Sequence, residues 1–337
     1  MAARDPSAHR PVRPRPRWYT IRPRFLVALG VILLSIGGYV WWYWLPMGDG
    51  PAGPPVPDEP FRRVWRRGPV VLVAMGDSIS TGFGAGGEEN GYVRRLFRTP
   101  PDDPPDVRDH DLSHVFPDLT LVELAMNAAD SDDTASWQLG QLDRYPPDVL
   151  GVVVVTVGGI DLIHDYGREP PRDGAIYGAT YEQAVVWGAA FRQRLEGLLD
   201  GLRERFPGGV HVFLANVYDP TDGVGDIDAV QPLLRCAKGL PPWPDALRAL
   251  ELWNRHIAEA AAARPDFVHL VDIHGPLLGH GIHCRDRDNP YYHEDDPHHW
   301  YWFNLEDPNS RGYDAIRRLF LNRMIEVLDP ARKAVTA

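Results

Sequence analysis

Five short apolar runs follow one another along the chain after residue 68, each separated from the next by a polar or amphipathic stretch. The runs are Val70 to Ala74, Leu119 to Leu124, Val149 to Val157, Val210 to Ala215 and Val268 to Val271. A continuous run of β-branched and aliphatic residues is typical of a strand that is buried on both faces of a parallel sheet. Because helical segments alternate with these runs, we expect an α/β domain with helices on both faces of the sheet.

Three segments with apolar residues at helical spacing are expected to form the main helices. They are Thr180 to Phe206, Pro244 to Ala263 and Arg311 to Leu328. The first begins with Thr180 and Gln183, a spacing that favours a capping box in which each side chain accepts the other residue's backbone amide. We assign the apolar stripes of these helices to core packing.

A longer apolar stretch near the amino terminus predicts a membrane anchor at residues 25–46. Residues 25 to 45 carry no charge, and at about 1.5 Å per helical residue they are long enough to cross a hydrocarbon core of roughly 30 Å. Seven arginines and one acid precede the stretch, so the positive-inside rule keeps the amino terminus cytoplasmic and places the rest outside. The aromatic cluster Trp41 to Trp44 suits the headgroup region. The alternative is a cleaved signal peptide, whose apolar region is normally shorter, at roughly 7 to 15 residues.

Composition and charge predict how the rest of the chain is divided. We expect a cytoplasmic tail at 1–24, the anchor, a Pro/Gly-rich linker at 47–68 that forms a semi-rigid stalk, one folded domain at 69–330 and a tail at 331–337. The chain has a formal net charge of −11, and the part after residue 24 carries −17 because residues 1–24 hold +6. An acidic external domain argues against nucleic acid as a partner. The expected partner is the lipid bilayer, through residues 25–46. The oligomeric state is not specified.

Two cysteines lie in irregular segments of a domain expected to face an oxidising compartment. Cys236 and Cys284 are candidates for a disulfide, with two free thiols as the alternative. A zinc site is a further possibility, with His280, His283 and Cys284 as ligands, but the spacing of these residues matches no standard zinc pattern. Arginines interleave with the nearby acids, and their charge disfavours a cation there. We therefore expect neither a metal nor a cofactor.

Ser78 is the candidate nucleophile. The apolar run that ends at Ala74 leads directly into Gly76-Asp77-Ser78 and then into a glycine-rich turn. Open α/β sheets bind their ligands at the carboxyl ends of the strands. A hydroxyl at that point, with Gly82 and Gly84 allowing close approach of backbone amides, suits acyl transfer. A helix cap formed by Asp77 and Ser78 is the alternative interpretation.

Four segments in order resemble the conserved blocks of the GDSL/SGNH hydrolase family. They are Gly76-Asp77-Ser78, Leu124-Ala125-Met126-Asn127-Ala128-Ala129, Val157-Gly158-Gly159-Ile160-Asp161-Leu162 and Asp307-Pro308-Asn309-Ser310-Arg311-Gly312-Tyr313. The resemblance covers about Pro69 to Leu328 and implies a three-layer α/β/α fold with a flavodoxin-like parallel sheet. It also implies ester hydrolysis through an acyl-enzyme on Ser78.

Such a mechanism needs donors for the oxyanion of the tetrahedral intermediate. We expect the backbone amides of Ser78 and Ala128 to be two of them, although the family usually has glycine at the second position. In the third block, Ile160 replaces the family's donor asparagine and cannot donate. Asn127 is the candidate substitute, with a turn-capping role as the alternative. Asp77, Gly159 and Asp161 are placed as supporting residues, and Asp161 is expected to cap a helix or hold the loop.

The general base is displaced from its family position. The family pattern Asp-x-x-His-Pro-Asn appears here as Asn304-Leu305-Glu306-Asp307-Pro308-Asn309. We expect Asp307 to orient an imidazole arriving from elsewhere, because such triads are defined by geometry and not by chain order. His280, flanked by two glycines, is the first candidate. His283, His298 and His299 are the alternative bases.

Together these features predict a membrane-anchored, outward-facing serine hydrolase of carboxylic esters without a cofactor. Lipid esters or acylated carbohydrate esters are the expected substrates, and the aromatic residues Trp300 to Phe303 are candidates for lining an acyl or sugar pocket. Two alternatives remain open. One is a non-catalytic binding or scaffold domain on the same fold, and the other is an acyltransferase or deacetylase of envelope polysaccharide.

Overall fold

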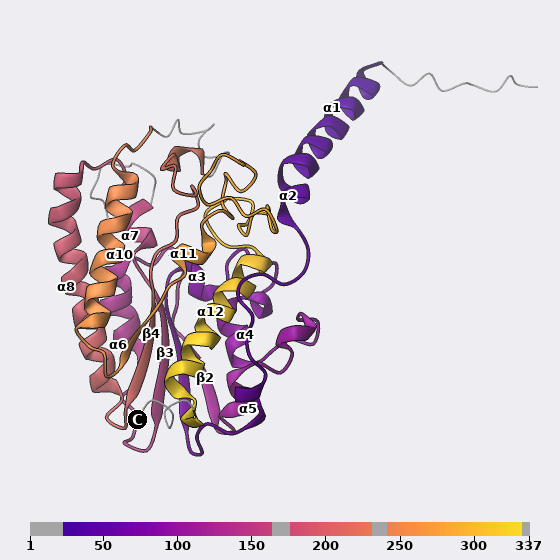
Figure 1. Cartoon of the computed structure of the whole chain (residues 1–337). Coiled ribbons are helices and arrows are strands. Elements are labelled where there is room, and N and C mark those ends of the chain that lie inside the picture. The colour runs from indigo at the N-terminus through magenta and orange to yellow at the C-terminus, as the bar shows by residue number, and fades with distance from the viewer. Residues whose placement is uncertain (1–22, 164–175, 231–240, 332–337) are drawn as a thin grey trace, which may run out of the picture. The chain divides into compact units, whose positions relative to one another are not determined.

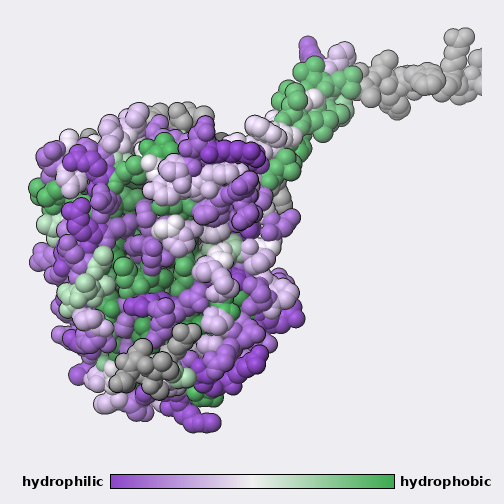
Figure 2. Space-filling view, viewed as in Figure 1, coloured by the Kyte–Doolittle hydropathy of each residue, from purple (hydrophilic) through white to green (hydrophobic). Residues whose placement is uncertain are grey.

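The computed structural model describes residues 23–163, 176–230 and 241–331, and the chain forms two units, up to Leu45 and from Pro46 onward. The described part of the first unit is an apolar helix. It runs through α1 (Pro23–Tyr39), a π-helical turn η1 (Val40–Trp44) and into α2 (Leu45–Met47). Most of its apolar side chains are exposed, and Figure 2 shows it as a largely apolar surface. Its length and composition suffice for a membrane span, and a signal sequence meets the same criteria.

A five-stranded parallel sheet organises the second unit. The strands are β1 (Val70–Gly76), β2 (Leu119–Glu123), β3 (Leu150–Thr156), β4 (Val210–Ala215) and β5 (Val268–Val271). Their order is β2-β1-β3-β4-β5, and every neighbouring pair is parallel. This is the flavodoxin-like order, so the predicted fold class is confirmed. All residues of β1, and all but the first of β3, are buried, as the continuous apolar runs predict.

Helices cover both faces of this sheet (Figure 1). On one side lie α8 (Tyr181–Arg205) and α10 (Ala246–Ala262), which pack against each other. On the other side lie α4 (Tyr92–Phe97), α5 (Leu112–Val115) and α12 (Ser310–Leu328). The predicted capping box is present, since Thr180 N–H donates to Gln183 Oε1 at 2.9 Å and Gln183 N–H donates to Thr180 Oγ1 at 3.4 Å. The shorter helical elements are α3 (Ser78–Thr81), α6 (Leu139–Gln141), α7 (Gly159–Ile163), α11 (His274–Leu277), η2 (Glu59–Arg62), η3 (Glu88–Asn90), η4 (Pro105–Val107), η5 (Asp133–Gln138) and η6 (Ile227–Ala229).

The segment 47–68 was expected to form a semi-rigid stalk, but it packs on the folded unit at several points. Ala52, Val56 and Trp65 are buried and belong to the hydrophobic core. The amide of Ala52 donates to Asp314 Oδ2 at 3.1 Å, and the amide of Trp65 donates to the carbonyl of Val115 at 2.9 Å. Apolar residues placed among the prolines explain the difference, because they add burial that a solvated stalk lacks.

The end of β1 requires glycine. Gly76 has a φ of +115°, and a Cβ built on it would lie 1.7 Å from the carbonyl oxygen of Thr156 on β3. The buried side chain of Gln138 fixes this point from the other side, accepting from Gly76 N–H and donating to Gly76 O, both at 2.8 Å. The chain therefore leaves the sheet in a defined direction immediately before Ser78.

Cys284 is a buried thiol in the structure, and burial raises its pKa to about 12. Its predicted partner, Cys236, lies outside the described residues. The disulfide therefore stays a prediction.

Candidate active site

Ser78 stands just after the carboxyl end of strand β1, as the first residue of α3. Asp77 caps this short helix, because its Oδ1 accepts the amide of Ile79 at 3.1 Å. Ser78 itself is half-buried. The helix-cap interpretation and the nucleophile interpretation are thus both compatible with the same turn, since Asp77 is the cap and Ser78 presents the hydroxyl.

The hydroxyl of Ser78 is hydrogen-bonded to a carboxylate. Ser78 Oγ donates to Asp307 Oδ1 at 2.7 Å, and Asn304 Nδ2 donates to Asp307 Oδ2 at 2.5 Å. The Oδ1 of Asn304 accepts the amides of Glu306 and Asp307 at 3.1 and 3.0 Å. Burial raises the pKa of Asp307 above its ordinary value. The hydrogen bonds from Ser78 and Asn304 lower this pKa, but their effect is smaller. The three side chains form a continuous chain of hydrogen bonds.

Local structure on both sides holds Asp307 in place. Asn309 caps α12, since its Oδ1 accepts the amides of Arg311 and Gly312 at 2.9 and 3.0 Å. Before it, Pro308 forms an isolated bridge with Tyr301, and the carbonyl of Asp307 accepts the amide of Trp302 at 2.6 Å. Asp307 is therefore fixed between a helix cap and a bridged loop.

Asp77 is a second buried carboxyl at this site. Its Oδ1 also accepts the hydroxyl of Thr156 at 2.7 Å. Burial is the main cause that raises the pKa of Asp77 to about 7, and the charge of Asp307 adds to the shift. Asp77 joins the ends of β1 and β3 and lines the same pocket as Ser78.

The second block lies beside the first. Met126 N–H donates to the carbonyl of Gly76 at 3.0 Å, and Thr81 Oγ1 donates to Asn127 Oδ1 at 2.5 Å. Ala128 has a φ of +62°. That left-handed conformation favours glycine, and it is found here at the position where the family usually has one. Asn127 is exposed and its side-chain oxygen is bound to α3.

The third block forms α7. Asp161 is fully buried, accepts the amide of Ser131 at 3.0 Å and is paired with Arg194 at 3.2 Å. Burial raises the pKa of Asp161 to about 6. It joins α7 to the loop before η5 and to α8. Ile160 and Gly159 line the pocket, and an ideal Cβ on Gly159 would lie 3.7 Å from Asp77 Oδ2.

The structure does not bring the predicted base, His280, to Ser78. His280 is buried between Trp300 and His293, with ring centroids 3.5 and 4.6 Å away, and its Nδ1 donates to the carbonyl of His298 at 2.9 Å. Burial lowers its pKa to about 4. Throughout residues 23–163, 176–230 and 241–331, the side-chain hydroxyl of Ser78 is bonded to Asp307 and to no histidine.

The alternative bases are held by other contacts. His283 Nε2 lies 3.0 Å from Asp226 Oδ2, and His298 Nδ1 lies 2.7 Å from Asp296 Oδ1. His299 is buried, which lowers its pKa to about 4. The described residues contain no group of three or more His, Cys, Asp or Glu side chains arranged to hold a metal ion.

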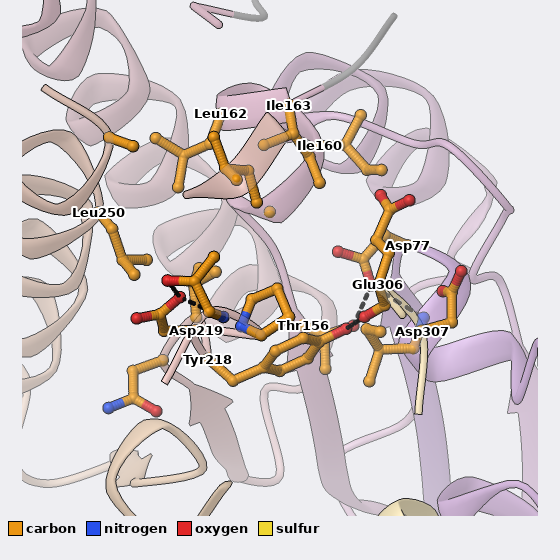
Figure 3. Close-up of a pocket in the computed structure, with 18 of the residues that line it drawn as sticks. Asp77, Thr156, Ile160, Leu162, Ile163, Tyr218, Asp219, Leu250, Glu306 and Asp307 are labelled. Atoms are coloured by element: carbon orange, nitrogen blue, oxygen red, sulfur yellow. Dashed lines mark hydrogen bonds between the residues drawn. The ribbon is translucent and has the colours of Figure 1, made fainter. Parts of the chain in front are cut away.

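A largely apolar pocket leads away from Ser78. Asp77, Glu306 and Asp307 gather at one end, Ile160, Leu162 and Ile163 form a wall, and Leu250 lies at the far end (Figure 3). The empty volume is about 820 Å³, part of it open to solvent. Tyr218 forms part of the opposite wall, and its hydroxyl donates to the carbonyl of Glu306 at 2.7 Å. The pocket combines a polar end, which holds the hydroxyl, with an apolar wall, and Asp219 adds a polar group near Leu250.

The sequence did not point to Asn304 or to most of the apolar lining of the pocket. The aromatic residues Trp300 to Phe303, which were expected to line a pocket, are not among the residues that line this one. Asn304 occupies the position of the aspartate in the family pattern Asp-x-x-His, three residues before Asp307. That spacing could have indicated the role of Asn304, because an Asn or Asp side chain at this position can accept the backbone amides two and three residues further on. The pocket residues come from several separate segments of the chain, so no local pattern marks them.

Comparison with curated proteins gives no match. Among solved structures, the chain is similar to an extracellular lipase from Streptomyces rimosus, at 17% identity over 75% of this chain and 99% of that chain, with a TM-score of 0.45. It is also similar to phospholipase A1 from Streptomyces albidoflavus, at 18% identity over 75% and 98%, with a TM-score of 0.44. The model of the GDSL-like Lipase/Acylhydrolase family matches residues 74–315. The chain therefore belongs to the GDSL-like lipase/acylhydrolase family.

Proposed function

We propose that the second unit is a serine ester hydrolase that cleaves carboxylic esters through an acyl-enzyme on Ser78. The observation that carries the proposal is the direct hydrogen bond from Ser78 Oγ to Asp307, at the polar end of an apolar pocket. A serine next to a proton acceptor has the arrangement that nucleophilic catalysis requires. Membership of the family supports the same chemistry.

The proposed substrate is a lipid ester with an extended acyl chain. Leu162, Ile163 and Leu250 line the interior of the pocket, and an acetyl group would leave most of that surface without contacts. Burial of apolar surface contributes about 25 cal/mol per Å², so a longer chain binds more tightly until the pocket is filled. This favours lipid esters over acetylated carbohydrate. Acyl transfer to a sugar hydroxyl would use the same acyl-enzyme and differ only in the acceptor.

Two backbone amides are the proposed oxyanion donors. In the described part of the chain, neither Ser78 N–H nor Ala128 N–H donates a hydrogen bond. The bonds of Met126 to Gly76 and of Asn127 to Thr81 keep the second block beside α3. Ile160 offers no donor, so we expect a slower enzyme than one with asparagine there, because losing one oxyanion donor costs about 10²- to 10³-fold in turnover.

The proposed location is the outer face of a membrane, with a single span at residues 25–46 and the amino terminus cytoplasmic. The apolar helix Pro23–Met47 and the arginines before it support this topology. The test is fractionation of cells that express the full chain. The protein should resist carbonate extraction and be digested by external protease. Release into the medium as a chain shortened by its first 45 or so residues would indicate a cleaved signal instead.

A second candidate is a domain that binds an acyl chain without cleaving it. The specific observation in its favour is that Ile160, an apolar side chain, stands where the family places its donor and lines the pocket. The two candidates predict the same ligand class. They differ in whether Ser78 reacts.

Labelling by a fluorophosphonate tests the nucleophile. The folded protein should be labelled, and Ser78→Ala should abolish labelling and ester hydrolysis together. Ser136→Ala is the matched control, because that serine is exposed and its hydroxyl donates to the carbonyl of Asp132 within its own helical turn. An unlabelled, folded wild-type protein that still binds fatty acids would favour the binding domain.

A series of p-nitrophenyl esters tests the substrate class. We expect kcat/KM to rise from the acetate to chains that reach Leu250. Leu250→Trp should move the preferred length to shorter acyl chains while the acetate rate stays close to that of the wild type. A flat or falling series in the wild type would contradict the lipid-ester proposal.

A further inference from the structure

Three side chains, Ser78, Asp307 and Asn304, are joined in the order in which a catalytic triad is joined. The hydroxyl donates to Asp307 Oδ1 at 2.7 Å, and Asp307 Oδ2 accepts from the amide of Asn304 at 2.5 Å. In the serine–histidine–aspartate arrangement, the middle member takes the proton and the third member orients it. Here the middle member is a carboxylate and the third member is a neutral amide.

The surroundings of Asp307 make its carboxylate a stronger base than an exposed one. An ordinary aspartate has a pKa of about 3.9, and a base is more effective when its pKa is closer to the working pH. Asp307 is 5% exposed, and burial raises its pKa. The titratable groups that face it are Asp77 from the end of β1, Tyr218 from the loop after β4 and Tyr313 from α12. Burial raises the pKa of both tyrosines further above their ordinary values, so they stay neutral.

The neighbouring carboxyl allows Asp307 to carry the charge. Burial and the charge of Asp307 raise the pKa of Asp77 to about 7. The charge of Asp307 is one of the causes of this upward shift, which favours the protonated form of Asp77 beside an ionised Asp307. Two carboxyls in unlike environments take different roles.

The side chain of Asn304 restricts the orientation of the carboxylate. The side-chain oxygen of Asn304 accepts the backbone amides of Glu306 and Asp307. These two bonds hold the side-chain amide group in one orientation. One carboxylate oxygen of Asp307 is thereby engaged, and the other faces Ser78.

We infer that Asp307 is the catalytic base of this hydrolase, accepting the proton of Ser78 directly, and that Asn304 is its positioning residue. The inference rests on the proposed function. As Oγ bonds to the ester carbonyl carbon, its proton passes to Asp307 and the carbonyl π electrons move to oxygen. When the carbonyl re-forms, the alcohol leaves with the proton from Asp307. Water then attacks the acyl-enzyme, giving its proton to Asp307, which returns that proton to Ser78 as the acid leaves.

The test is the pH profile of kcat/KM on a short-chain ester. In the wild type, the midpoint of the acid limb of this profile should lie at a pH below the ordinary histidine pKa of about 6.5. Asp307→His should move the limb up to about that value, and Asp307→Asn should lower kcat/KM by at least about 100-fold. Asn304→Ala should shift the limb upward, because a hydrogen bond that favours the charged form is lost. Asp266→Asn, a matched change at an exposed carboxylate paired with Arg203, should leave the profile unchanged.

The outcomes separate this inference from the proposed function. If the wild type hydrolyses no ester and Ser78 is not labelled, the proposed function fails. If hydrolysis depends on Ser78 but survives Asp307→Asn, or if the wild-type limb lies at the histidine value and disappears in His280→Gln, only the role of Asp307 is overturned. Should Asp307→Asn fail to fold, the position of the wild-type limb and its movement in Asp307→His decide the matter.

Discussion

Gly76 shows how one residue fixes both the sheet and the site. Its missing side chain allows β1 to approach the carbonyl of Thr156, and the positive φ of Gly76 turns the chain towards Ser78. No other residue fits without moving the backbone of β3.

We therefore predict that Gly76→Ala destabilises the domain by more than about 3 kcal/mol, since a methyl group would overlap backbone atoms and also require an unfavourable φ. Urea unfolding measures the change. Gly197→Ala is the control, because that glycine lies inside α8 and, outside the backbone of its own helix, no atom of the described residues lies within 4 Å of an added Cβ. It should stabilise by roughly 0.5 to 1 kcal/mol. Equal effects of the two substitutions would contradict the steric argument.

His280 was expected to be the catalytic base, and in the structure it is a buried side chain. Its ring stacks on Trp300, and burial lowers its pKa to about 4 from the 6.5 of an unfolded chain. Between these values the folded state binds fewer protons than the unfolded state. Its stabilising contribution is therefore complete above about pH 6.5 and is lost as the pH falls towards 4.

The prediction is that His280→Gln reduces the loss of stability between pH 7 and pH 5. Urea midpoints of the wild type and the variant at both pH values measure this difference. The variant should be less stable at pH 7, where the stacked ring is lost without compensation. A loss on acidification as large as in the wild type would show that other groups cause the acid sensitivity.

At the site, the sequence pointed to residues that directly follow strands and, through the family resemblance, to Asp307. It missed the contacts that depend on loop geometry. Ser78 and Asp161 were placed by the ends of apolar runs, which the sheet brings to one edge. His280 and Asn304 lie in the stretch between α11 and α12, which has no periodic pattern to define where its side chains point. The sequence does not indicate that the ring of His280 stacks on Trp300. Only the folded loop shows this contact.

The elements themselves followed from periodicity. The strand runs, the three long helices and the Thr180 capping box all appear within two or three residues of their predicted bounds. The polar face that α12 buries was not foreseen. Arg317 and Arg318 are almost fully buried on this helix, although helical patterns normally place charged residues outside.

Ion pairs explain the buried charges on α12. Arg317 pairs with Asp103 and with Asp314 of its own helix, and Arg95 lies 3.1 Å from Asp103. Because removal of one partner leaves buried charges uncompensated, we predict that Arg317→Met destabilises by about 3 to 5 kcal/mol.

Arg323→Met on the same helix is the matched control. Its guanidinium pairs with Glu326 near the surface, and such pairs contribute about 0 to 1 kcal/mol. Urea unfolding of both variants gives the comparison. If Arg317→Met proves no more destabilising than Arg323→Met, the network does not stabilise α12 in the way proposed.

On the scale of the whole molecule, the alternation of strands and helices was enough to predict a parallel sheet with helices on both faces. The flavodoxin-like arrangement of that sheet was implied by the family resemblance, and the strand order itself comes from the structure. The role of 47–68 was not predictable in the same way. Its prolines and glycines resemble a linker, and only tertiary contacts reveal that Val56 and Trp65 complete the core.

The boundary of the folded unit gives the last prediction. A chain that begins at Pro46 should unfold in a single transition, whereas one that begins at Pro69 should be less stable by about 3 to 5 kcal/mol or fail to fold. The deleted segment supplies Trp65, whose ring contacts Phe116 edge-on and whose Nε1–H donates to the carbonyl of Pro60 at 2.9 Å. Trp65→Ala in the longer chain should reproduce much of this loss, since truncating a buried tryptophan costs about that amount. Identical urea midpoints for the two chain lengths would mean that the segment behaves as a stalk after all.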